Sequence, residues 1–356
     1  MTTGTRTSNG GNARGLFESA RRTAGMDEAA IYNRHLDVFL LWACRETGVV
    51  EALLDGPKRA PVVAEETGIT ERAAGVVLDA LVDLDYAERI GNGDHGDAAD
   101  REGDRDAADR EGDRYVAAAP LRAFDPGTDA LDRGMLPHRV DSLENYMQLP
   151  RVMRTGEPPE KGDREGFLNF VGAMATIEDA TVGEVVTTVE HAHPRPDRVL
   201  DVGGGPGRFG TEFARRGADV TLVDREGVLD LLADHHESAG LDTWAGDARE
   251  SLPSGFDLVF SARMTTSFTG DDLRDYFGNA FAALGPGGTF ACVERVRGHS
   301  EVAERFAVHM LTLSATGDTH TEAEYRSALA DAGFVDVALE DVPRTEFQAL
   351  LGRKPA

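Results

Sequence analysis

The chain has 356 residues but only two cysteines, very few lysines and no long apolar run. Cys44 and Cys292 each stand in an apolar segment, so we predict two buried thiols and exclude zinc sites built from cysteine clusters. Without a run of about 18 apolar residues, no membrane span is predicted. Residues 1–25 are largely polar and lack the apolar stretch of a secretory signal. We interpret them as a disordered tail and expect a cytoplasmic protein.

The charge of the chain is strongly unbalanced. It has 63 acidic against 37 basic residues and a net charge of −26, and its only lysines are Lys58, Lys161 and Lys354. Because so acidic a surface repels phosphate backbones, we expect no nucleic-acid partner. The composition is typical of adaptation to high intracellular salt, which screens self-repulsion. An ordinary acidic protein from a GC-rich organism is the alternative.

The first third of the chain predicts a small helical domain. Apolar residues recur at helical spacing between residues 30 and 84, and Thr70 stands where it can cap the helix that follows. Residues 86–90 and 115–117 resemble two strands of a wing. We therefore predict a winged-helix domain over residues 26–130.

A perfect tandem repeat separates the two predicted strands. The nine residues 97–105 recur as 106–114, without apolar periodicity. Such a segment cannot bury surface, so we predict a disordered insertion over 94–114. The glycine pairs and the apolar position of a calcium-binding β-roll are missing.

Residues 131–190 predict a mainly helical connector, and alternating strands and helices follow in 191–356. The connector has an apolar stripe that core or dimer packing explains, or alternatively the wall of a substrate pocket; its members are Phe167, Phe170, Val171 and Met174. The expected strands are 199–202, 220–223, 258–260, 289–294, 334–339 and 347–351, and the expected helices are 209–216, 271–284, one from 302, and 322–332. This alternation predicts an α/β domain with a mostly parallel, doubly wound sheet.

A glycine-rich loop, Asp201-Val202-Gly203-Gly204-Gly205-Pro206-Gly207, joins the first of these strands to the next helix. Glycines let the backbone turn sharply and let a ligand approach closely, and the helix N-terminus offers free N–H groups. Asp224 ends the next strand, where a carboxylate can accept hydrogen bonds from both ribose hydroxyls. The pattern predicts a cofactor that contains adenosine.

Two further carboxylates favour S-adenosyl-L-methionine (SAM) over a nicotinamide dinucleotide. Residues 205–210 match the dinucleotide pattern G-x-G-x-x-G, which is a weak signal alone. Asp201, at the mouth of the loop, opposes a pyrophosphate but suits the cationic amino group of a methionine moiety. Asp247 follows the probable third strand, where it can accept from the adenine amino group. We predict SAM as the cofactor and no metal.

Together these motifs resemble the class I SAM-dependent O-methyltransferases of plant and bacterial secondary metabolism. The resemblance covers about residues 30–353 and rests on 199–207, Asp224, Asp247, 284–288 and the winged-helix front. It implies a Rossmann-like, seven-stranded domain, a homodimer formed through the N-terminal domain, and a small-molecule acceptor. The SAM-binding residues that we predict are Asp201, Gly203, Gly205, Gly207, Asp224, Asp247, Ala248 and, near the methionine end, Arg263. A surface salt bridge is the alternative role for Arg263.

The catalytic segment departs from that family. The family pattern resembles R-H-x-L-H-D-W after the fourth strand, whereas this chain has Arg263-Met264-Thr265-Thr266-Ser267-Phe268. Thr266 stands where the family has its histidine base, and threonine has no accessible pKa for that role. Either Thr266 only positions an acceptor that is already ionised or nucleophilic, or Glu294 or His309 acts as the base, or the protein binds SAM without O-methylation. Glu294 as a structural carboxylate and His309 as a core histidine are the alternatives.

We therefore predict a SAM-dependent methyltransferase for a small apolar or aromatic acceptor, with hydroxyl oxygen preferred and nitrogen, carbon or sulfur open. A DNA-binding regulator would need a basic recognition helix, but residues 71–84 offer only Arg72 among acidic residues. The histidine pairs 191/193 and 235/236 lack a matching acidic cluster, so we predict surface residues there.

Overall fold

The computed structural model of the chain describes residues 28–91, 112–125 and 127–356, with side chains from residue 36 onward. Contacts divide it into two units, residues 1–127 and 128–356. The predicted tail and most of the predicted insertion lie outside the described residues. Within the described part, no helix is both long enough and apolar enough to cross a membrane.

The first unit contains four α-helices, a two-stranded sheet and a 3-10 turn in its described part. They are α2 (Glu28–Glu46), α3 (Val49–Leu54), α4 (Ala60–Thr67), α5 (Glu71–Asp83), β1 (Ala87–Ile90), β2 (Arg114–Ala117) and η2 (Ala119–Phe124). As predicted, Thr70 caps α5, its side chain accepting from the N–H of Ala73 at 3.2 Å. Strands β1 and β2 pair antiparallel.

The second strand starts earlier than the sequence suggested. Arg114 was predicted to end the insertion, but it pairs with Ile90 and so belongs to β2. The pairing extends because main-chain hydrogen bonds of a ladder do not depend on side-chain polarity. Cys44 is buried in this unit, as predicted, and burial raises the pKa of its thiol to about 12.

The second unit is built on a seven-stranded sheet, as predicted. Its strands are β3 (Arg198–Val202), β4 (Asp219–Asp224), β5 (Asp242–Ala245), β6 (Phe256–Ala262), β7 (Leu284–Glu294), β8 (Val335–Asp341) and β9 (Gln348–Arg353). They lie in the order β5-β4-β3-β6-β7-β9-β8, with the first five parallel and β9 antiparallel to both neighbours. Strand β7 begins earlier than the predicted strand 289–294, and residues 286–288 lie inside it where the register shifts between Phe256 and Leu258 of β6.

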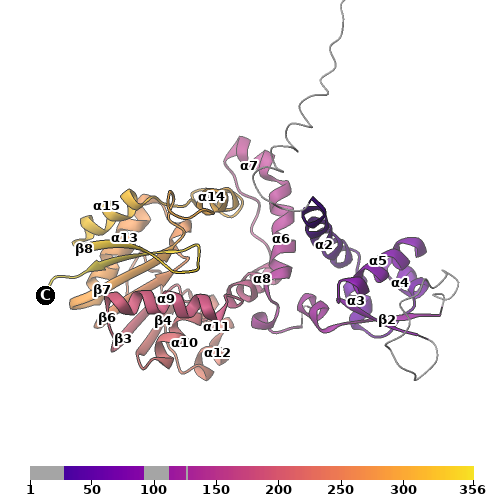
Figure 1. Ribbon diagram of the computed structural model, residues 1–356, viewed down its shortest axis with the longest axis horizontal. Helices are drawn as coiled ribbons and strands as arrows, with labels where there is room; N and C mark the ends of the chain where they lie inside the picture. Colours follow the sequence, from indigo (N-terminus) through magenta and orange to yellow (C-terminus); the bar gives the residue numbers. More distant parts are fainter. Residues whose placement is uncertain (1–27, 92–111, 126) are drawn as a thin grey trace, which may run out of the picture. The chain divides into compact units, whose positions relative to one another are not determined.

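Helices cover both faces of this sheet (Figure 1). Those of the second unit are α6 (Met135–Met147), α7 (Leu149–Thr155), α8 (Arg164–Ala175), α9 (Asp179–Ala192), α10 (Arg208–Arg215), α11 (Glu226–Leu231), α12 (Ala233–Ser238), α13 (Gly270–Ala283), α14 (Ala303–Leu311) and α15 (Glu322–Ala332), with 3-10 turns η3 (Ala130–Asp132) and η4 (Thr265–Ser267). The predicted connector 131–190 lies within this unit.

The two faces have separate apolar cores. On one face α9 and α10 pack on the sheet, and Phe209 and Phe213 lie 5.4 and 5.2 Å from the ring of Phe260. On the other face α13 and α15 surround Phe290, whose ring centroid lies 5.0 Å from that of Phe277. Cys292, also predicted to be buried, lies in this second core. Burial of both faces explains why the central strand β6 is mostly apolar.

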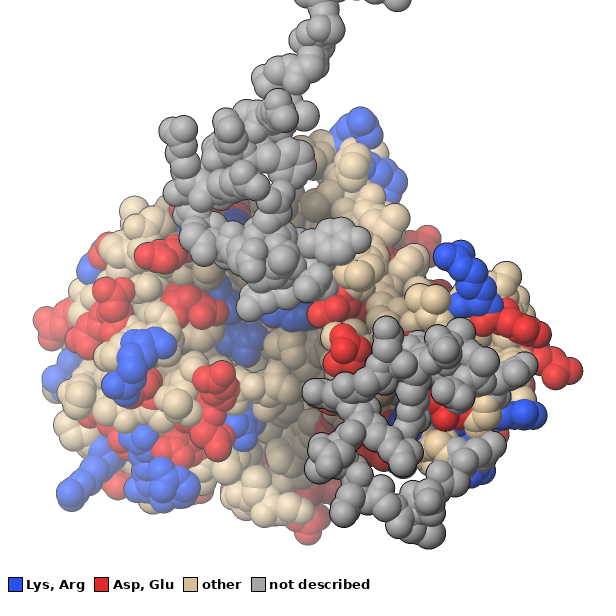
Figure 2. All heavy atoms as spheres, turned by 45° about the vertical axis from the view of Figure 1, so that its right-hand side comes forward, with Lys and Arg blue, Asp and Glu red and all other residues tan. Residues whose placement is uncertain are grey.

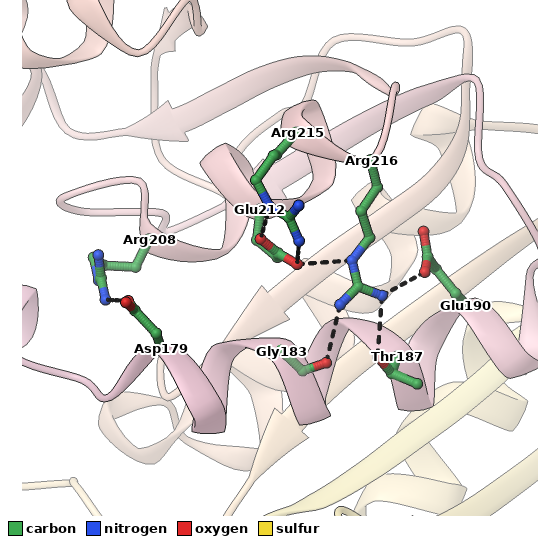
Figure 3. Close-up of polar contacts among 8 residues, drawn as sticks. All are labelled: Asp179, Gly183, Thr187, Glu190, Arg208, Glu212, Arg215 and Arg216. Atoms are coloured by element: carbon green, nitrogen blue, oxygen red, sulfur yellow. Dashed lines mark hydrogen bonds and ion pairs between the residues drawn. The ribbon is translucent and has the colours of Figure 1, made fainter.

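An ion-pair network ties α9 to α10 (Figure 3). Arg216 binds Glu190 of α9 at 2.6 Å and Glu212 of α10 at 2.8 Å, and it also donates to Gly183 O and Thr187 Oγ1. Arg215 donates to both carboxylate oxygens of Glu212. These partners lower the pKa of Glu212 to about 2. The network fixes the helix that follows the glycine loop against its neighbour.

The strand order reverses beside β3, where a ligand crevice is expected in a doubly wound sheet. From β3 the chain proceeds outward to β4 and β5, then returns to β6 on the other side of β3. In a doubly wound sheet, ligands bind outside the carboxyl ends of the strands at such a reversal. The glycine loop after β3 and the segment after β6 both begin there.

Candidate active site

The glycine loop folds back onto the end of β4. Gly203 and Gly205 both have left-handed φ angles, +70° and +51°. The N–H of Gly203 donates to Val223 O at 2.7 Å and that of Gly205 to Asp224 Oδ2 at 2.9 Å. A Cβ at Gly203 would lie 2.6 Å from Met264 Sδ, whereas one at Gly205 would meet nothing within 4 Å. Gly205 therefore turns an open backbone face toward a ligand, and Gly203 allows the segment after β6 to approach closely.

Asp224 is held in place by two backbone donors. Besides Gly205, the N–H of Arg225 donates to Oδ1 at 2.8 Å. The side chain remains half-buried at the sheet edge. Since each carboxylate oxygen has two acceptor sites, both oxygens can still accept from a ligand hydroxyl.

The sequence suggested that Asp201 lies at the mouth of the loop, but the structure places it beneath the loop. Its side chain is 1% exposed, and Oδ2 accepts from the N–H of Gly210 at 3.0 Å. Burial raises the pKa of Asp201 to about 7, and Asp224 adds to the increase. Because β3 alternates its side chains between the two faces, Asp201 points toward α10. Its direct effect is on the first turn of that helix.

Two histidines predicted to be surface residues instead support the loop. His236 is 1% exposed and its Nε2 lies 2.9 Å from Gly205 O, while His235 Nε2 lies 3.0 Å from Pro206 O. Since both acceptors are carbonyls, each Nε2 carries the proton. Burial lowers the pKa of His236. No motif marks these residues, because α12 was not predicted and its packing brings them to the loop.

Asp247 already has a strong partner in the protein. Arg249 donates to its Oδ1 and Oδ2 at 2.9 and 2.6 Å and also pairs with Asp272 at 3.2 Å. The Arg249 hydrogen bond lowers the pKa of Asp247. Ala248, next in the chain, is 8% exposed. An adenine amino group would share Asp247 with Arg249.

Arg263 shows the clearest signs of a functional residue. It is a non-glycine residue with a left-handed φ of +59°, immediately after β6. Such strained positions concentrate at functional sites. Its Nη2 reaches only the sulfur of Met174, at 3.2 Å, and in the described part of the chain its buried Nε has no hydrogen-bond partner. Burial lowers its pKa. An anion would complete this site.

The segment after Arg263 is clamped from below. Glu294 is 1% exposed, and its Oε1 accepts from Thr265 N at 2.6 Å and Thr265 Oγ1 at 2.8 Å. Thr265 is also hydrogen-bonded to Tyr325 through its Oγ1 and to His320 through its carbonyl oxygen. Thr266 is 6% exposed, and its carbonyl accepts from Asp318 N. Burial raises the pKa of Glu294, and both hydrogen bonds of its Oε1 go to Thr265.

His309 lies in an aromatic cluster. Its ring centroid is 5.7 Å from that of Tyr146 and 5.4 Å from that of Phe306. Arg295, directly after β7, stacks on Phe306 at 4.5 Å. The rings of His138 and Phe170 pack 5.5 Å apart, and the charge of His138 acts on His309. Met310, next to His309 in α14, is 5% exposed.

The residues fit SAM in three respects. Gly205 offers open space beside its backbone, Asp224 offers free acceptor positions next to it, and Arg263 is a half-buried cation whose Nε has no hydrogen-bond partner among the described residues. An adenosine, its ribose hydroxyls and an amino-acid carboxylate would use these groups in turn. Among the described residues, no group of acidic, histidine or cysteine side chains could hold a metal ion.

The chain is similar to known methyltransferases. The profile of a family described as "Methyltransferase domain" matches residues 175–339. The 3-hydroxy-5-methyl-1-naphthoate 3-O-methyltransferase of Streptomyces sahachiroi is 28% identical, over 83% of this chain and 86% of that protein. The mitomycin biosynthesis 6-O-methyltransferase of Streptomyces lavendulae is 24% identical, over 81% and 82%.

Solved structures show the same fold. Mitomycin 7-O-methyltransferase MmcR superposes with a TM-score of 0.67 at 18% identity, covering 97% of this chain and all of that one. Human N-acetylserotonin methyltransferase, solved with SAM, has a TM-score of 0.62 at 18% identity, covering 99% and 100%. Residues 175–339 of this chain thus match a methyltransferase domain, and the chain is similar over most of its length to O-methyltransferases.

Proposed function

We propose that the enzyme methylates a hydroxyl group of a small aromatic acceptor. The observation that carries the proposal is the similarity, over more than four fifths of the chain, to enzymes named for O-methylation of a naphthoate and in mitomycin biosynthesis. The cluster around His309 supports an aromatic acceptor, because stacked and edge-on rings bind aromatic ligands well.

For the cofactor we propose a division of roles. Asp224 accepts from the ribose hydroxyls, Gly205 leaves room for the adenosyl group, and Arg263 binds the methionine carboxylate. Gly203 and Gly207 support the cofactor indirectly, because they let the loop pack closely against Met264 and Leu241. Asp201 acts indirectly, through its hydrogen bond to Gly210 at the start of α10. Asp247 and Ala248 border the adenine.

For the chemical step we propose that the protein mainly aligns the acceptor. When bound, SAM supplies an electrophilic methyl group, and in-line alignment can contribute a large part of the rate. Glu294 positions the segment after β6 through Thr265. Thr266 contributes to packing, since it is nearly buried and carries no titratable group. Of the three candidate catalytic residues, His309 is the one that faces aromatic side chains.

We also propose a homodimer formed through the first unit. On α2 the side chains of Leu36 and Phe39 are 51% and 42% exposed, although both are apolar. Exposed apolar side chains of this size favour burial against a partner. Sedimentation of Leu36→Glu/Phe39→Glu against wild type tests this surface; a dimer that persists unchanged contradicts it.

Two environmental proposals follow from composition. The protein is cytoplasmic, which suits two buried, unpaired cysteines, and it is adapted to high salt, which suits its net charge of −26. Acidic side chains spread over the visible surface, with basic ones among them (Figure 2). On α5 the exposed acidic residues argue against nucleic acid as a partner.

Methyl transfer to a panel of hydroxynaphthoates, hydroxyquinones and aminophenols tests the function directly. Purified protein is incubated with SAM carrying a labelled methyl group, in molar salt, and products are separated by mass spectrometry. We expect transfer to an aromatic hydroxyl. Label found only on nitrogen, carbon or sulfur, or none at all with every acceptor while SAM binds, contradicts O-methylation.

A further inference from the structure

We propose that Tyr146 and His309 together take the proton of the acceptor hydroxyl. This inference rests on the proposed function and deepens it, because it supplies the base that Thr266 cannot be. Tyr146 stands at the end of α6 and His309 in α14, so more than 160 residues separate them in the chain. No sequence motif brings them together.

The pair is hydrogen-bonded and accessible. Tyr146 Oη lies 2.8 Å from His309 Nδ1, and the two rings meet edge-on at 68°. Tyr146 is 40% exposed and His309 is half-buried. Glu294 and Thr266 differ in this respect, since they are almost completely buried and a substrate hydroxyl cannot reach them as they stand.

The charges around His309 keep its imidazole neutral. Burial, with smaller contributions from His138, Arg295 and Arg139, lowers its pKa to about 4. None of these neighbours is acidic. Helix α7 also packs on α14, and its basic residues Arg151 and Arg154 bind carbonyl oxygens of their own segment. A neutral imidazole whose Nδ1 bears a lone pair can accept the Tyr146 proton.

The proton transfer balances without another reactant. The acceptor hydroxyl gives its proton to Tyr146 Oη while the Tyr146 proton moves to His309 Nδ1, so tyrosine stays neutral and the imidazole becomes cationic. The acceptor oxygen forms its bond to the methyl carbon as the carbon–sulfur bond breaks, and that electron pair remains on sulfur. The products are the methyl ether, S-adenosylhomocysteine and imidazolium, which then loses its proton to water. General base catalysis of this kind contributes about 10²- to 10⁴-fold.

The test compares Tyr146→Phe, His309→Asn and the double variant with wild type. Tyr86→Phe and His299→Asn, which change the same residue types outside the cluster, are matched controls. On the aromatic acceptor found in the panel we expect each single variant to lose about 100-fold in kcat, and the double variant no more. Affinity for S-adenosylhomocysteine, measured by calorimetry, should stay within about twofold.

The chemical readout is the acidity of the acceptor. A nitro-substituted form of the same acceptor is ionised at neutral pH, so the variants should methylate it almost as fast as wild type does. On the unsubstituted acceptor their rate should rise about tenfold per pH unit until it reaches that of wild type. Full activity of Tyr146→Phe, or an equal loss on both acceptors, overturns the proposal.

A measurement without turnover separates this proposal from the proposed function. The ¹⁵N chemical shift of His309 Nδ1 should be that of a hydrogen-bond acceptor in wild type and should change in Tyr146→Phe. A protonated Nδ1 in the resting enzyme overturns the proton relay, even where methyl transfer is confirmed. Loss of all methyl transfer in wild type, with the expected shift present, counts against O-methylation instead.

Discussion

The two halves of the crevice are built in different ways. Above β3 and β4, the site consists of a short continuous loop and one carboxylate, held by main-chain hydrogen bonds. Above β6 and β7, it consists of side chains from α6, α8 and α14, brought together by tertiary packing. The first arrangement serves a cofactor that many enzymes share, whereas the second can change one side chain at a time to suit another acceptor.

We expect Asp224→Ala to have the largest effect on the cofactor half of the site. Loss of two charge-assisted hydrogen bonds should weaken S-adenosylhomocysteine binding about 100-fold, or about 2.7 kcal/mol. Calorimetry measures this, with Asp219→Ala as the control, since Asp219 is exposed at the other end of β4. Unchanged affinity of Asp224→Ala would falsify the ribose assignment.

Arg263→Gln tests the residue that lies between the two halves of the site. We expect about 10- to 30-fold weaker binding of S-adenosylhomocysteine, because a buried carboxylate contact is lost. Methylthioadenosine lacks that carboxylate and should bind both proteins equally well. The exposed Arg274→Gln serves as control. If methylthioadenosine is weakened to the same degree, Arg263 acts on the shape of the loop and not on the carboxylate.

Glu212→Gln tests how much the ion pairs between α9 and α10 contribute to stability. The pKa of Glu212, about 2 in the folded protein, lies below its unfolded value, so its contribution to stability is present above about pH 4.5 and is lost as the pH falls toward 2. Urea unfolding at pH 7 should show a loss of about 1–2 kcal/mol that shrinks toward pH 2. The exposed Glu340→Gln should change little. A loss that does not depend on pH would indicate altered packing.

The smallest effect is expected from His236→Ala. Removing its hydrogen bond to Gly205 O should weaken S-adenosylhomocysteine binding about threefold and lower the free energy of unfolding by about 1 kcal/mol. His191, exposed at the end of α9, offers a control substitution. Binding as weak as that of Asp224→Ala would mean that the loop collapses without this histidine.

These halves also differ in how far the sequence could predict them. The glycine loop, the position of Asp224 after its strand and the mostly parallel sheet follow from local motifs and the alternation of strands and helices, and the structure agrees. The burial of Asp201 and Glu294 was missed, because which face of a strand a residue occupies depends on the pleat. Tyr146 and the supporting role of His236 were missed, because each depends on packing between distant helices. Arg263 was marked by position alone, and only the structure reveals its strained backbone and unsatisfied Nε.

Arg216 in Figure 3 pairs with Glu190 and Glu212, where Arg215 supplies a second positive charge, whereas Arg249 pairs with both Asp247 and Asp272. Lys58 likewise stands between Asp55 and Glu66. Sharing reduces the repulsion between acidic side chains in a chain with 37 basic and 63 acidic residues. A site in which one basic side chain pairs with two carboxylates still carries one excess negative charge. Dissolved cations screen this excess negative charge, so lowering the salt concentration should destabilise the protein first at sites where one basic side chain pairs with two carboxylates.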